Sequence, residues 1–116
     1  TGVQTCALPI SIFRLAIEEV ESWYLGDRAA VLEAYPRARK DVLDRYEQDS
    51  VCGTWELLAD ALHPGGATAV KTAGWPLPGQ IKHEWAQAIG PKMDLHRNLS
   101  PSFNKLVEAL SKLAAA

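Results

Sequence analysis

The chain has 116 residues, of which 47% are hydrophobic and 22% are charged, and its formal net charge at pH 7 is −2. This composition excludes an intrinsically disordered protein, and the length suits one compact domain. No apolar run approaches the ~20 residues that a membrane-spanning helix needs, so no membrane partner is expected. Six basic and eleven acidic side chains lie in residues 1–62, against six basic and three acidic ones in residues 63–116. This asymmetry is compatible with a metal site beside a phosphate-binding surface, and also with two ordinary solvated surfaces.

The first ten residues, TGVQTCALPI, show neither a helical nor a strand period and carry no charge. They lack the basic region and the small-residue cleavage site of a signal peptide. They agree, codon by codon, with the translation of a short-read sequencing adapter. We therefore interpret residues 1–11 as adapter-derived and residues 12–116 as the C-terminal part of a single domain from a longer protein. Cys52 is then the only native cysteine, which is typical of a cytoplasmic protein, and a disulfide with Cys6 is not expected.

The spacing of apolar residues predicts one strand near the start of the chain, followed by helices. Residues 12–17 (IFRLAI) alternate with period two, which is typical of a strand. From Glu18 the period becomes helical, and this helix should end near Gly26. Asp27 is placed to cap a further helix over residues 28–35, which a following proline ends.

The rest of the chain predicts three internal helices and a terminal one. Apolar spacing favours helices over residues 39–48, 54–62 and 79–89, with Thr54 as an N-cap. The glycines and prolines that follow His63 predict a loop up to the third of these helices.

The terminal helix should begin after a Ser100 cap, with Pro101 in its first position. Its apolar residues form one continuous stripe: Phe103, Leu106, Val107, Leu110 and Leu113. The four tryptophans lie on or beside stripes of this kind, and at least three of them are expected in the core.

A single strand cannot complete its own backbone hydrogen bonds, and four to five one-sided helices need an apolar surface to cover. We therefore expect the strand to belong to a sheet encoded upstream. The predicted fold class is a mainly α fragment of an α/β domain.

Three carboxylates, Glu18, Glu19 and Glu21, lie where the predicted strand ends and the helix begins. In open α/β sheets functional sites collect at this edge, and carboxylates there suit Mg²⁺ or Mn²⁺. A structural interpretation is also open, because the helix dipole favours each acidic side chain in a first turn by ~0.3–1 kcal/mol. Lys71 and Lys82 are candidates for contacts with phosphate groups, or are ordinary surface charges. The histidines share no spacing that indicates a zinc site.

Four blocks together resemble the bacterial domain-of-unknown-function (DUF) family 4276 over nearly all of residues 12–113. They are AIEEVESWYLGD, YPRARKDVLDRYEQDSVCGTWELLADALHPGG, AGWPLPGQIKHEWAQAIGPKMD and RNLSPSF. That family is Toprim-like and akin to the metal-binding nuclease domains of the overcoming-lysogenisation-defect group. Its members are often encoded near ATPases.

The resemblance places the family's E-x-E-x-W block on Glu19, Glu21 and Trp23, and its following acidic position on Asp27. Toprim-like sites also need an upstream glutamate and a paired aspartate motif, which this sequence lacks, as a truncation predicts. The resemblance thus implies that the fragment alone is inactive.

Two functions of the intact protein follow from the resemblance. In the first it is a Mg²⁺-dependent nuclease or phosphodiesterase in defence or nucleic-acid processing. Glu19 and Glu21 would then be catalytic residues and metal ligands, and Lys71 and Lys82 would contact nucleic acid. In the second it is a non-catalytic partner module of a neighbouring ATPase, and the glutamates only cap a helix.

Overall fold

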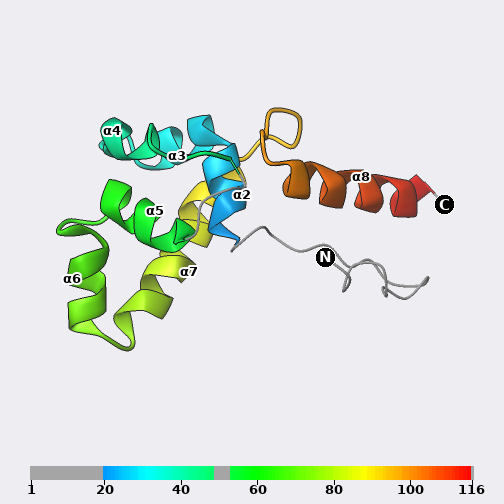
Figure 1. The fold of residues 1–116 in the computed structure, drawn as a ribbon. Coiled ribbons are helices and arrows are strands. Elements are labelled where there is room, and N and C mark those ends of the chain that lie inside the picture. Colours follow the sequence, from blue (N-terminus) through cyan, green and yellow to red (C-terminus); the bar gives the residue numbers. More distant parts are fainter. Residues whose placement is uncertain (1–19, 49–52, 116) are drawn as a thin grey trace.

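The computed structural model describes residues 20–48 and 53–115, and these residues are mostly helical, with no strand among them (Figure 1). The expectation of a mainly helical chain is confirmed for this part of the protein. The strand predicted over residues 12–17, the carboxylates Glu18 and Glu19, and both cysteines lie outside the described residues. The α/β origin of the chain therefore stays a prediction. No described helix has the length and apolar character to cross a membrane.

The first two described helices, α2 (Glu21–Gly26) and α3 (Arg28–Ala34), meet at Asp27. The Asp27 side chain accepts a hydrogen bond of 3.1 Å from the backbone N–H of Ala30, so it caps α3 as predicted. Helix α2 ends at Gly26, also as predicted. Helix α3 ends two residues before Pro36, because a proline disfavours helical backbone in the residue before it.

The helix predicted over residues 39–48 is much shorter, since α4 covers only Lys40–Leu43. After it the backbone N–H groups of Arg45 and Tyr46 donate to carbonyls three residues back, at 3.1 Å each. Such tight turns do not propagate an α-helix. Val42 and Leu43 still bury their side chains, so the apolar pattern was correct and only the length was wrong.

Helix α5 (Thr54–Leu62) corrects one predicted cap. Its N-cap is Gly53, in the left-handed region at φ 77°, and Thr54 is the first helical residue. A left-handed backbone at this position strongly favours glycine, and the cap lies one residue earlier than predicted. The most buried side chains of α5 include Leu58 and Ala59, as predicted, whereas Trp55 and Leu62 are half-buried.

Helix α6 (Gly66–Ala73) occupies part of the predicted loop. Its first turn is stabilised by the Asp60 carboxylate on α5, which accepts a hydrogen bond of 2.8 Å from the N–H of Ala67. Ala67 and Val70 bury the inner face of the helix. A cap from a neighbouring helix leaves no local signal, which is why the glycines and prolines around α6 were misleading.

Helix α7 (Leu77–Ile89) begins two residues before its predicted start and continues into a 3-10 turn, η1 (Gly90–Lys92). Its predicted apolar face is confirmed, since Ile81, Trp85 and Ile89 are buried. These side chains join a common core with residues of α3, α4, α5 and α6, among them Val31, Val42, Leu58 and Val70.

The last helix, α8 (Pro101–Ala115), extends away from the other helices (Figure 1). Ser100 caps it as predicted, because its hydroxyl accepts a hydrogen bond of 3.2 Å from the N–H of Phe103. Phe103 is the one buried residue of the helix and contacts the Trp23 ring edge-to-face at 5.6 Å. The rest of the predicted stripe is not buried to the same extent, since Leu110 and Leu113 are 48% and 62% exposed.

The prediction that at least three tryptophans lie in the core is wrong. Trp85 is buried, whereas Trp55 is half-buried against the core and Trp23 is half-buried against Phe103. Trp75 is 87% exposed. It lies in the turn between α6 and α7, where no stripe constrains it.

Candidate functional site

Glu21 is the predicted site residue that the structure describes at the start of α2. It lies in the first turn of that helix and is only 6% exposed. Burial raises the pKa of Tyr24, one turn along, and the negative charge of Glu21 raises it further. The carboxylate of Glu21 therefore acts electrostatically on its helix neighbour from a position largely shielded from water.

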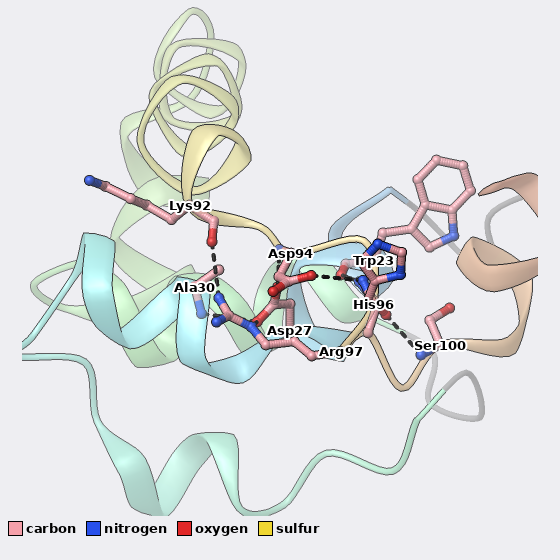
Figure 2. Close-up of polar contacts among 9 residues, drawn as sticks. Trp23, Asp27, Ala30, Lys92, Asp94, His96, Arg97 and Ser100 are labelled. Carbon is pink, nitrogen blue, oxygen red and sulfur yellow. Dashed lines mark hydrogen bonds and ion pairs between the residues drawn. The ribbon is translucent and has the colours of Figure 1, made fainter. Parts of the chain in front are cut away.

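Asp27 is bound on three sides by hydrogen-bond donors (Figure 2). One oxygen accepts from the N–H of Ala30 and, at 2.6 Å, from Nε of Arg97. The other accepts from the N–H of Asp94 at 2.8 Å. Because the side chain is fully buried and both oxygens are in use, Asp27 serves as a cap and an anchor and is poorly suited to hold a metal ion.

Arg97 reaches Asp27 from the segment that joins η1 to α8. Its guanidinium also donates to the carbonyl of Lys92 at 3.0 Å. The hydrogen bond to Asp27 raises the pKa of Arg97, and the charges of Asp27, Asp94 and Glu33 act in the same direction. Arg97 thus closes the loop 93–99 against the junction of α2 and α3.

Asn98 fastens the same loop to α2. Its amide nitrogen donates to the carbonyl of Trp23 at 2.9 Å, and its amide oxygen accepts from the N–H of Ser100 at 2.8 Å. The N–H of Leu99 donates to the carbonyl of Gly26 at 2.9 Å. A Cβ atom on Gly26 would overlap the side chain of Asn98, so this close approach requires glycine.

A shallow cleft of about 370 Å³ opens beside this network. Its apolar lining comes from α2, α4 and the residues that follow them, including Leu25, Leu43 and Tyr46. Its charged lining is Asp27, Arg28 and Arg97. Arg28 is paired with Asp44 at 2.6 Å, and both partners are partly exposed.

Lys71 and Lys82 come together on a different face of the molecule. Their ammonium nitrogens lie 5.6 and 5.3 Å from the centre of the Trp55 ring. Lys71 is in the last turn of α6, Lys82 is in α7, and Trp55 is in the first turn of α5. Lys71 also pairs with Glu56 at 3.4 Å.

Of the two predicted metal ligands, Glu19 and Glu21, the structure describes Glu21. Among residues 20–48 and 53–115, no three side chains of His, Cys, Asp or Glu gather in a way that could hold a metal ion. A carboxylate is a ligand type that Mg²⁺ accepts, so Glu21 fits by its chemistry. Glu19, its predicted companion, lies outside the described residues.

Sequence reasoning assigned Asp27 its cap but did not find its partners Asp94 and Arg97. The two partners lie almost seventy positions away in the chain, and no periodicity connects them to α2. Hydrogen bonds between residues so far apart leave no local pattern in the sequence. The signal that existed was that residues 26–27 (GD) and 97–100 (RNLS) stand between predicted helices.

No family model, curated protein or solved structure matches this chain. Among the described residues, the features that bear on function are Glu21, the Asp27 network and the lysine pair.

Proposed function

We propose that this chain is the C-terminal part of a Toprim-like protein of DUF family 4276, whose intact form is a Mg²⁺-dependent nuclease or phosphodiesterase. The observation that carries the proposal is the burial of the Glu21 carboxylate in the first turn of α2. The helix dipole favours a glutamate in the first turn, but burial adds a desolvation cost that an exposed position would avoid. A carboxylate kept in such a place is typical of a functional site.

In this proposal Glu21 and Glu19 would hold Mg²⁺ together with further acidic residues supplied from outside this chain. The bound metal would stabilise negative charge on the phosphate oxygens during cleavage. Asp27 and Arg97 act on the site indirectly, because their ion pair at 2.6 Å fixes the end of the helix that carries Glu21. Lys71 and Lys82 supply positive charge for the nucleic-acid backbone.

The test uses the full-length protein with Glu21→Gln, which keeps the size of the side chain and removes its charge. We expect Mg²⁺-dependent cleavage of labelled DNA or RNA to fall at least about a hundredfold, since a metal ligand is lost. Glu84→Gln, on an exposed position of α7, is the matched control and should retain activity. Thermal unfolding of each variant checks that folding is intact. Full cleavage by Glu21→Gln would remove Glu21 from the site.

A second function, a partner module for a neighbouring ATPase, is favoured by a different observation. The stripe of α8 presents Leu110 and Leu113 to solvent, and Leu99 before it is 75% exposed. Exposed apolar side chains that continue along one helix face are typical of a docking surface. Leu110→Lys with Leu113→Lys should then abolish co-purification with the ATPase. Unchanged co-purification would exclude α8 as the contact.

A further inference from the structure

The cleft beside the Asp27 network has the size and the lining of a small-ligand site. Its volume of about 370 Å³ lies at the lower end of the ~300–1,000 Å³ range of such sites. Leu25 and Leu43, both buried, give it an apolar lining, to which Leu99 adds an exposed side chain. An apolar surface with a few charged groups is the usual composition of a pocket that binds a small organic molecule.

Arg97 lines this cleft with part of its guanidinium unused. A guanidinium has five N–H groups in a planar fork. Nε donates to the buried Asp27 at 2.6 Å and Nη2 donates to the carbonyl of Lys92 at 3.0 Å (Figure 2). Arg97 has no other partner among the described residues, so Nη1 keeps its N–H groups. An anion in the cleft therefore finds donors on a side chain that is already ordered, which lowers the cost of binding.

Arg28 lines the same cleft from the first turn of α3. Its contacts with Asp44, at 2.6 Å, and with the carbonyl of Lys40, at 3.3 Å, are both made by Nη2. The side chains of Arg28 and Asp44 are 40% and 64% exposed, and an exposed ion pair of this kind contributes little to stability. Arg28 can therefore turn toward a bound anion at small cost.

The charges around the two arginines favour a ligand with a single negative charge. Three carboxylates act electrostatically on Arg97: those of Asp27, Asp94 and Glu33. Arg28 has its own acidic partner in Asp44. The cleft thus offers N–H donors rather than an excess of positive charge. A phosphate monoester carries about −1.5 to −2 at pH 7, whereas a carboxylate carries one charge and matches a guanidinium fork with its two oxygens.

We propose that this cleft binds a small organic molecule that has one carboxylate and an apolar body. The carboxylate accepts hydrogen bonds from Arg28 and Arg97, and the body packs against Leu25, Leu43 and Leu99. The site depends neither on Glu21 nor on a metal ion, so it goes beyond the function proposed above. Because the cleft is lined from α2, α3, the end of α4 and the loop before α8, the ligand should also stabilise the fold against heating.

The test measures binding of naphthalene-1-acetate to the full chain by ligand-observed nuclear magnetic resonance. We expect saturable binding with a Kd of about 1 mM or below, the affinity of a ligand of this size at ordinary ligand efficiency. The uncharged naphthalene-1-acetamide keeps the shape and lacks the carboxylate, so it should bind at least about tenfold more weakly. 1-Naphthyl phosphate should bind no more tightly than the carboxylate.

Two variants, each with a matched control, locate the site. Arg28→Gln should weaken binding about tenfold, because charge-assisted hydrogen bonds are lost. Arg39→Gln is its control, since Arg39 also forms an exposed ion pair, with Asp41 at 3.7 Å, and is not among the residues that line the cleft. Leu99→Ala should weaken binding about threefold by removing apolar contact. Its control is Leu113→Ala on α8, which is likewise exposed.

Four results would overturn the proposal. They are absence of saturable binding up to about 10 mM ligand, equal binding of the acid and the amide, tighter binding of the phosphate, and equal affinity of Arg28→Gln and Arg39→Gln. Thermal unfolding without ligand checks that each variant is folded. If Arg28→Gln does not fold, the comparison of Leu99→Ala with Leu113→Ala decides in its place, and equal affinities there overturn the proposal.

Discussion

Removing the Asp27 carboxylate should be among the most destabilising single changes at the junction of α2 and α3. In Asp27→Ala the cap of α3 is lost, which costs about 1 kcal/mol. The N–H of Asp94 loses a charged acceptor at 2.8 Å, which costs about 2 kcal/mol more. The sum of about 3 kcal/mol is a large part of the free energy of unfolding of a domain this size.

The assay is urea unfolding of the chain, followed by far-ultraviolet circular dichroism. Asp27→Asn should lose less than Asp27→Ala, since the amide retains one acceptor oxygen. Asp44→Ala is the matched control, because Asp44 also pairs with an arginine at 2.6 Å but its side chain is 64% exposed. An exposed ion pair contributes less than about 1 kcal/mol. If Asp27→Ala and Asp44→Ala differ by less than about 0.5 kcal/mol, the anchoring role given to Asp27 is refuted.

Two further predictions concern α2. Gly26→Ala should lower the free energy of unfolding by about 1–3 kcal/mol, because the added Cβ meets the side chain of Asn98. Gly90→Ala is the control and should be neutral or stabilising, because nothing lies within 4 Å of its added Cβ. Equal effects of the two changes in urea unfolding would contradict the close packing at Gly26. Glu21→Gln should lower the pKa of Tyr24 toward its ordinary 10.0 without reaching it, because burial is the larger cause of the rise. Tyrosinate absorbance measures this, and an unmoved titration would mean that Glu21 does not act on the ring. The pKa of Tyr24 is higher in the folded state than in the unfolded state, so folding favours the protonated phenol. The contribution of Tyr24 to the free energy of unfolding is therefore fully present below pH 10.0 and is lost as the pH rises through the folded pKa.

The helices that could be predicted were those with local signals at both ends. Helix α8 had a serine cap, a proline in its first position and a regular stripe, and its start is confirmed. Helix α6 could not be predicted, because Asp60 of another helix caps it and glycines surround it. The length of α4 could not be predicted either, since its apolar spacing continues beyond the point where the backbone tightens.

In the candidate site, too, local signals predicted some features and only folding revealed others. Glu21 and Asp27 stood out as acidic residues at helix boundaries, and the role of Asp27 as a cap is confirmed. Lys71 and Lys82 were separate surface charges in the sequence, and only folding shows that both lie over Trp55. The role of Glu21 as a metal ligand stays a prediction.

The sequence by itself determined the helical character of the described chain, the break at Asp27 and the faces that α5 and α7 bury. These features follow from interactions within a few residues, which periodicity and capping record. Tertiary structure alone decided that Arg97 and Asn98 return to α2, that Trp75 stays exposed, and that the later part of the α8 stripe stays open to solvent. The physical reason is that these outcomes depend on which distant surfaces meet, and a side chain's own neighbours in sequence carry no information about that.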